Sequence, residues 1–174
     1  MVNNLKIALS LCCLLAMLIM SGCADIATHK ANNSNKASKL NLQLGVAYLK
    51  KGDMLRAQRK LEQAYKQNPH NIDAITMLAY WHQLNHQDKL AQHWYQKGFK
   101  QQPHNLRLIN NYSYFLCQRG QFTNAVQGFL YVARHYSHQY QQRQAYENAG
   151  LCSFRGQNPQ RARQLLAKAS ALKS

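Results

Sequence analysis

The sequence predicts an all-α protein, a superhelix of about four helix-turn-helix units. Two observations support this fold class. The tripeptide Pro-His-Asn occurs at 69–71 and again at 103–105, an offset of 34 residues. Ala57, Ala91 and Ala125 share the same offset. A fixed period of this kind is the signature of a repeat array, whose units bury a continuous core only when they stack on their neighbours.

A period of about 34 residues is that of the tetratricopeptide repeat. We expect a repeat domain over residues 40–174, with repeats near 38–71, 72–105, 106–139 and 143–174, and about three extra residues before the last one. Small residues let paired helices approach closely, and proline ends a helix because it disfavours helix in the residue before it. The residues expected to maintain the repeat structure are Gly45, Ala57, Pro69, Ala91, Pro103, Ala125, Gly150 and Ala162.

The start of the chain has the pattern of an export signal. Lys6 precedes an apolar run of 14 residues, which is shorter than the roughly 20 residues that span a bilayer. The tripeptide Ser21-Gly22-Cys23 then resembles a bacterial lipobox, with Met20 in place of the usual leucine. We therefore expect a lipoprotein signal peptide over residues 1–22 and a covalent lipid on Cys23, with no other cofactor. The alternative is an uncleaved N-terminal anchor.

Residues 23–39 are predicted to form the lipidated N-terminus and a flexible tether. They are rich in Asn, Ala, Ser and Lys without an apolar period, so they offer little surface to bury against a core. Ala24 follows the lipid cysteine, whereas bacterial sorting rules place an aspartate there for retention in the inner membrane. The acid here is Asp25, one residue later. The expected location is therefore the bacterial outer membrane, on its periplasmic face.

The inner face of such a superhelix is a usual binding surface for peptides, and the first helix of each unit supplies it. Its mixture of apolar, aromatic, amide and arginine side chains suits a protein segment better than a metal or a phosphate. The residues predicted to form this partner-binding groove are Leu42, Val46, Leu49, Thr76, Tyr80, Arg107, Asn110, Tyr114, Leu151 and Phe154. The same face should also include Lys50, Gln83, Cys117, Gln118, Glu147 and Arg155.

Composition argues against an enzyme. The chain has only six Asp and Glu residues, and no two of them form a recognisable acid–base motif. His82 and His86 are four residues apart, but the glutamate of the zinc-protease helix is missing, so no metal site is expected. The net charge of +16 is spread over all four units. For an exported protein, it points to anionic lipid before nucleic acid.

Cys117 and Cys152 are the two cysteines that follow Cys23, and they fall on the first helices of adjacent units. An oxidising periplasm would allow them to pair, provided that the helices bring their Cα atoms within about 7 Å. Two half-buried free thiols are the simpler interpretation, and this is the expectation.

Two segments resemble one particular family, the type IV pilus biogenesis lipoproteins that act as secretin pilotins (PilF/PilW type). The run from Arg107 to Leu116 is similar to that family's NNYGxFL segment, with Ser113 in place of glycine. Tyr146 to Leu151 is similar to its ENLGL segment, with Ala149 in place of leucine. The matching residues of the first segment are Asn110, Asn111, Tyr112 and Phe115.

The resemblance implies a non-catalytic scaffold that carries the secretin subunit to the outer membrane, where the subunits assemble into a ring. The family typically has six repeats, and the pattern here supports four. The alternative function is that of a generic tetratricopeptide adaptor lipoprotein serving another cell-envelope complex. Both functions imply a protein partner, and neither implies a small molecule.

Overall fold

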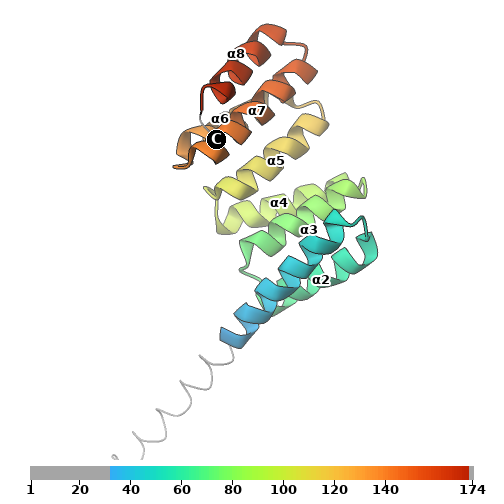
Figure 1. The fold of residues 1–174 in the computed structure, drawn as a ribbon. Coiled ribbons are helices and arrows are strands. Elements are labelled where there is room, and N and C mark those ends of the chain that lie inside the picture. Colours follow the sequence, from blue (N-terminus) through green and yellow to red (C-terminus); the bar gives the residue numbers. More distant parts are fainter. Residues whose placement is uncertain (1–31, 173–174) are drawn as a thin grey trace, which may run out of the picture.

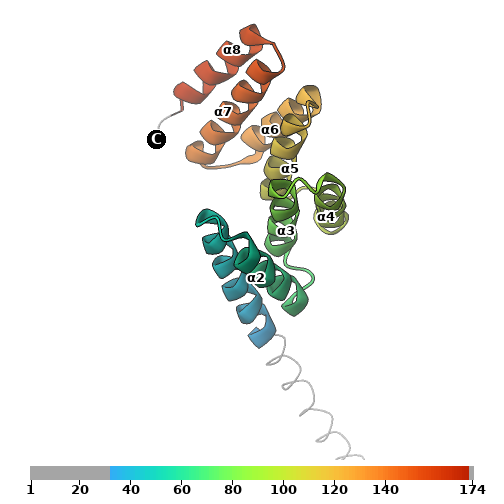
Figure 2. The same cartoon turned by 90° about the vertical axis from the view of Figure 1, so that its right-hand side faces the viewer.

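A computed structural model describes residues 32–172, which form an all-helical superhelix (Figures 1 and 2). A first helix covers 32–50 of the described part. The helices that follow are α2 (Met54–Gln67), α3 (Ile72–Leu84), α4 (Asp88–Gln101), α5 (Leu106–Gln118), α6 (Phe122–His135), α7 (Gln139–Arg155) and α8 (Pro159–Ser170). Residues 32–172 contain no strand. The predicted fold class is therefore confirmed.

Consecutive helices pack in pairs, and each pair is one predicted unit. Two of the new units begin at an asparagine. Asn71 accepts hydrogen bonds from the backbone N–H groups of Asp73 and Ala74, and Asn105 accepts one from Leu108. These side chains satisfy backbone donors that the first turn of a helix leaves without a partner. The prolines that end the second helices, Pro69 and Pro103, lie just before these caps.

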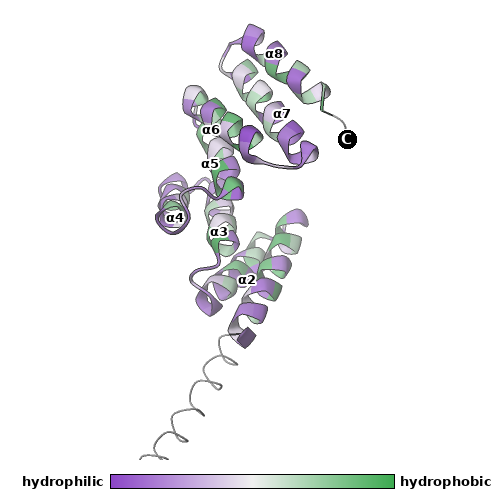
Figure 3. Ribbon diagram, turned by 90° about the vertical axis from the view of Figure 1, so that its left-hand side faces the viewer, coloured by the Kyte–Doolittle hydropathy of each residue, from purple (hydrophilic) through white to green (hydrophobic). Residues whose placement is uncertain are grey.

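The small residues lie where helices meet. Ala57, Ala91, Ala125 and Ala162 are all buried. A Cβ atom added to Gly45 would lie 2.7 Å from Leu61, and one added to Gly150 would lie 2.8 Å from Leu166. Leu61 and Leu166 are the large residues that fill the groove beside each glycine. Figure 3 shows hydrophobic and hydrophilic residues mixed along the helices, as in helices buried on one side only.

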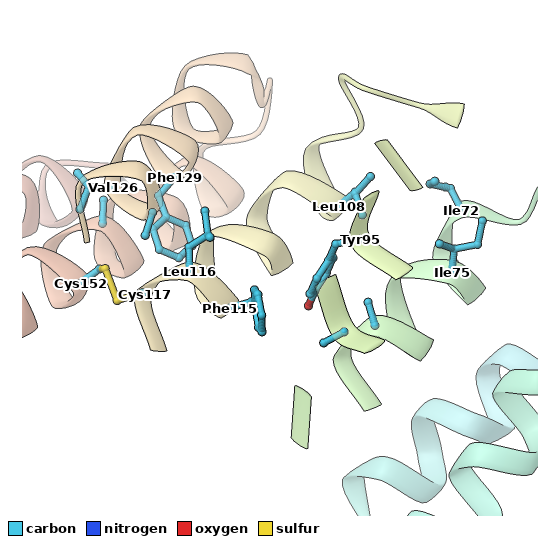
Figure 4. Close-up of a cluster of buried hydrophobic side chains, with 14 of the residues drawn as sticks. Ile72, Ile75, Tyr95, Leu108, Phe115, Leu116, Cys117, Val126, Phe129 and Cys152 are labelled. Carbon is cyan, nitrogen blue, oxygen red and sulfur yellow. A yellow bond between two sulfur atoms is a disulfide. The ribbon is translucent and has the colours of Figure 1, made fainter. Parts of the chain in front are cut away.

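The core has two main parts. The larger cluster runs from Ile72 in α3 to Leu165 in α8 and includes Tyr95, Phe115 and Phe129 (Figure 4). A smaller cluster joins the first unit to the second and consists of Ala57, Leu61, Leu78 and Trp81. Half-buried Tyr65 and Trp94 pack against both clusters, with ring centroids 4.9 Å apart in an edge-to-face arrangement.

The predicted tether is wrong for residues 32–39, which are helical. Ser38 is fully buried, and its hydroxyl donates a hydrogen bond to the carbonyl of Ala64 at 2.8 Å. Asn71 donates to the Ser38 hydroxyl, and Ser34 donates to the carbonyl of Gln67. Hydrogen bonds rather than apolar contacts dock this segment, so the lack of an apolar period does not reveal it. The signal peptide and Cys23 lie outside the described residues.

The extra residues before the fourth unit extend a helix. Helix α7 has 17 residues, whereas α3 and α5 have 13 each. The added length is about one helical turn, and it lies at the start of α7. Gln142 in this turn donates a hydrogen bond to the carbonyl of Tyr136 at 2.6 Å, which ties the turn to the end of α6.

Candidate functional site

Three predicted groove residues meet between α5 and α7. Tyr114 of α5 and Leu151 and Phe154 of α7 line a hollow of about 330 Å³, which we call the apolar hollow. Their exposed fractions are 42%, 57% and 67%. The other lining residues are Cys117, Phe129, Asn148, Cys152 and Arg155.

The packing of α7 explains why these side chains are exposed. Ala149, Gly150, Cys152 and Ser153 are buried, so the opposite face of the helix is turned away from the core. Leu151 and Phe154 are three residues apart and therefore share that outward face. Large apolar side chains grouped on an exposed concave surface are typical of a binding site for protein.

Cys117 and Cys152 form a disulfide beside the apolar hollow (Figure 4). Their Cα atoms are 5.9 Å apart, and both residues are buried. The expectation of two half-buried free thiols is therefore wrong. Whether the two cysteines pair depends on the distance between α5 and α7, and the spacing of residues in the sequence does not give that distance. The disulfide fixes α5 to α7 directly beneath the exposed apolar side chains.

A chain of buried and half-buried polar side chains connects the second unit to the third. The Tyr95 hydroxyl donates to Oε1 of Gln83 at 2.9 Å, and Nε2 of Gln83 donates to Oε1 of Gln118 at 2.8 Å. Burial raises the pKa of Tyr95 far above its ordinary value. Burial and, secondarily, nearby Tyr114 raise the pKa of Tyr80. Tyr80 is half-buried in α3, and Tyr114 lies in α5 of the next unit.

The other end of this face is polar. Arg107 forms an ion pair with Asp73 of the preceding unit at 2.7 Å, and Asn148 donates to Asn110 at 3.5 Å. Asn110 lies in a second hollow of about 330 Å³ between α5 and α7, with Tyr136, Gln141, Gln144, Ala145, Glu147 and Asn148. A segment lying across α5 and α7 would meet polar groups at one end and the apolar hollow at the other.

Not every predicted groove residue is available to a partner. Thr76 is 2% exposed, and its hydroxyl donates to the carbonyl of Ile72 in its own helix. Its assignment to the groove is therefore wrong, because a buried β-branched residue can satisfy its hydroxyl within the helix. Leu42 and Leu49 are half-buried against the smaller core cluster. Val46 is half-buried in the same helix.

The histidine pair does not form a metal site. His82 lies in α3 with its Nδ1 2.6 Å from Oε1 of Gln87, whereas His86 lies in the turn that follows α3. Across residues 32–172, no three His, Cys, Asp or Glu side chains gather closely enough to hold a metal ion. Within the same range, no helix combines the length and the apolar character needed to cross a membrane.

Within residues 32–172, four stacked helix pairs, the first three at an offset of 34 residues, define a tetratricopeptide-repeat fold. No protein-family model matches the chain. It is 28% identical over 157 residues to the type IV pilus assembly protein PilF of Pseudomonas aeruginosa, covering 88% of this chain and 62% of that protein. The solved structure of the P. aeruginosa protein matches 81% of this chain with a TM-score of 0.73, at 28% identity and over 63% of its own chain.

Two further solved structures are similar. PilW, a widely conserved type IV pilus biogenesis factor, matches with a TM-score of 0.69 at 26% identity, over 79% of this chain and 62% of its own. The tetratricopeptide protein YrrB matches 89% of this chain and 81% of its own with a TM-score of 0.60, at 20% identity, and shows the fold alone. The chain is homologous to PilF and PilW, and spans less than two thirds of their length.

Proposed function

We propose that this protein is an outer-membrane lipoprotein that acts as a pilotin in type IV pilus biogenesis. In this role its repeat array binds a segment of the secretin subunit, while the lipid on Cys23 holds the complex at the periplasmic face of the membrane. Tethering raises the effective concentration of the partner where the ring assembles. No catalytic step is involved.

The apolar hollow carries the proposal, together with the homology to pilus biogenesis proteins. In the apolar hollow, Tyr114, Leu151 and Phe154 offer an aromatic and aliphatic surface to one or two apolar side chains of a partner. The disulfide keeps α5 and α7, the two sides of the apolar hollow, at a fixed separation. The hollow is therefore already ordered before a partner binds, which lowers the entropic cost of binding. Glu147, Asn110 and Asn148 next to it provide hydrogen-bonding groups for the partner's backbone.

The experiment replaces the chromosomal gene by plasmid-borne variants and measures secretin multimers in outer-membrane fractions. A Leu151→Glu/Phe154→Glu variant places two charges in the hollow and should reduce multimers strongly, while the variant itself still fractionates with the outer membrane. Leu55→Glu/Leu90→Glu is the matched control, because these leucines are 66% and 47% exposed on the second helices α2 and α4. This control should leave the multimers unchanged.

A Cys23→Ala variant tests the lipid. It should lose outer-membrane association and lower the multimers there. If gene deletion leaves the multimers unchanged, the pilotin role is refuted and the alternative of an adaptor for another envelope complex is favoured. If the control pair has the same effect as the hollow variant, the hollow is not the secretin site.

A further inference from the structure

A further hollow, on the first unit, is lined mainly by cations. It has a volume of about 280 Å³ and lies between the first helix and α2. Its lining residues are Tyr48, Arg56, Arg59, Lys60 and Gln63. We call it the cationic hollow. Like charges three and four residues apart on a helix repel one another, so this grouping has a cost in stability unless an anion is bound.

Neutral groups hold two of these cations, Arg56 and Lys60, in place. The Arg56 guanidinium lies 5.7 Å from the centroid of the Tyr48 ring. Lys60 donates hydrogen bonds to Oδ1 of Asn41 at 3.1 Å and to Oε1 of Gln63 at 3.2 Å. These contacts orient the cationic groups without neutralising them.

Among the cations of this hollow, Arg56 alone forms an ion pair with an acid of residues 32–172. Asp53 lies 3.2 Å from the Arg56 guanidinium and also caps α2. The second acid of the unit, Glu62, accepts a hydrogen bond from Gln58. Neither Arg59 nor Lys60 forms an ion pair with an acid of residues 32–172. The hollow therefore keeps an excess of positive charge.

The first unit has a larger net positive charge than the second unit beside it. Residues 32–71 contain eight Lys and Arg residues and two acids, whereas residues 72–105 contain three and two. The first unit forms one end of the superhelix (Figures 1 and 2). Nine residues lead from Cys23 to Asn32, and a chain of that length reaches at most about 32 Å. A lipid on Cys23 would therefore hold the first unit close to the membrane surface.

We propose that the cationic hollow binds the phosphate of an anionic lipid headgroup in the membrane that carries the protein. Arginine and lysine donate charge-assisted hydrogen bonds to phosphate oxygens. The contact orients the repeat array on the membrane and leaves the apolar hollow of the third and fourth units for the protein partner. This inference rests on the lipid attachment in the proposed function, but its test does not.

The test uses the mature chain from residue 23 with Cys23→Ser, which has no acyl chain and contains every residue of the described fold. Binding is measured by flotation with vesicles of phosphatidylcholine containing phosphatidylglycerol, and with vesicles of phosphatidylcholine alone. Arg59→Gln/Lys60→Gln removes two charges at the hollow. Arg161→Gln/Arg163→Gln is the matched control, because it removes two charges from α8 in the fourth unit.

The wild-type chain should float with the anionic vesicles and not with the zwitterionic ones. The hollow variant should bind roughly tenfold to thirtyfold more weakly, as expected for two basic residues lost from a membrane contact, while the control stays within about twofold. Circular dichroism should show equal helicity for all three proteins. Arg59→Lys should retain most of the binding, because it keeps the charge.

Three results would overturn the proposal. Equal losses in the hollow and control variants would mean that the net charge alone attracts the chain to vesicles. A wild-type chain that ignores anionic vesicles at moderate salt would remove the lipid contact altogether. Binding of inorganic phosphate that is lost in Arg59→Gln/Lys60→Gln, while the same variant floats with anionic vesicles as well as the wild type, would show that the hollow takes free phosphate instead. Each result leaves the secretin-multimer test of the proposed function unaffected.

Discussion

Four turns within the repeats have the same backbone conformation but different residues. Gly52 and Gly120 have φ angles of 74° and 75°. His86 and Gln157 occupy the equivalent turns of the second and fourth units with φ angles of 57° and 58°. Glycine adopts this left-handed conformation without a steric cost, whereas other L-residues pay for their Cβ atom. The turn geometry is thus kept even where the favoured residue is absent.

We predict that His86→Gly stabilises the protein by about 0.5–1 kcal/mol, because it relieves that strain. The change is measured as a rise in the urea midpoint. The reverse exchange, Gly120→Ala, should lower the midpoint, since nothing lies within 4 Å of an added Cβ atom and only the φ angle opposes it. A lower midpoint for His86→Gly would contradict the explanation.

Tyr95 is the buried residue with the clearest pH signature. It is 0% exposed and donates to Gln83. Tyr95→Phe should cost about 1–3 kcal/mol near pH 7, because it leaves Oε1 of Gln83 buried without its donor. Tyr140→Phe, at a side chain 53% exposed, is the control and should change stability by less than about 0.5 kcal/mol.

A second prediction for Tyr95→Phe concerns the loss of folding stability at alkaline pH. Burial raises the pKa of Tyr95 in the folded state, whereas the unfolded tyrosine ionises near pH 10. The stability due to neutral Tyr95 is therefore fully present below about pH 10 and is lost as the pH rises above it. Urea unfolding at pH 8 and pH 11 should show a smaller loss for Tyr95→Phe than for wild type. Equal losses would show that Tyr95 does not contribute.

Residue patterns predicted some environments better than others. The burial of the repeat alanines follows from their residue type and spacing, because few side chains suit those places. The assignment of Thr76 to the groove failed because threonine suits two environments. It can lie in a solvent-exposed groove, or it can be buried with its hydroxyl bonded to a carbonyl of its own helix. Whether Thr76 is buried depends on how α3 is rotated about its own axis against its neighbours. The repeat period does not fix that rotation closely enough to assign a single residue to one face.

At the scale of helices, the disulfide is the strongest constraint. It joins α5 to α7 across 35 residues of sequence, and closing a loop of that length is worth roughly 3–4 kcal/mol through the unfolded state. We predict that a reductant lowers the urea midpoint of the wild type to that of Cys117→Ala/Cys152→Ala, while the double variant does not respond to the reductant. Labelling of both cysteines in unfolded, unreduced protein would contradict the disulfide.

The 34-residue period predicted helix pairs, because each pair repeats the same packing. It did not predict the two lengthened helices. The first helix covers residues 32–39 through hydrogen bonds to α2, and α7 absorbs its extra residues as one more turn. Both additions are polar and lie at helix starts, where no apolar period marks them. Sequence periodicity reports buried faces and does not report helical turns held by polar contacts alone.

At the scale of the whole molecule, the division of the core should make the first unit the least stable part. The cluster that joins it to the second unit, formed by Ala57 and Leu61 of α2 with Leu78 and Trp81 of α3, is separate from the larger one, and no disulfide reaches it within the described residues. We predict that amide hydrogen exchange in the first helix and α2 reports a lower opening free energy than in α5 to α8. Repeat arrays commonly unfold by such partial steps.

The control for this prediction is Trp81→Ala, which removes the largest side chain of the smaller cluster. It should accelerate exchange in the first helix and α2 far more than in α7 and α8. Uniform acceleration along the chain would show that the array unfolds as one cooperative unit.

The scarcity of acids has a consequence for how copies of this protein share a surface. Four of the five acids in residues 32–172 are already paired with arginines of the same chain. Few carboxylates are thus left to meet the cations of a neighbouring copy. If the proposed lipid holds two copies in one leaflet, they repel each other over about a Debye length, near 8 Å at physiological salt. The distance between neighbouring copies would then be set by the charge of the protein itself. Each repeat array would stay free to bind a partner that is not another copy of this chain.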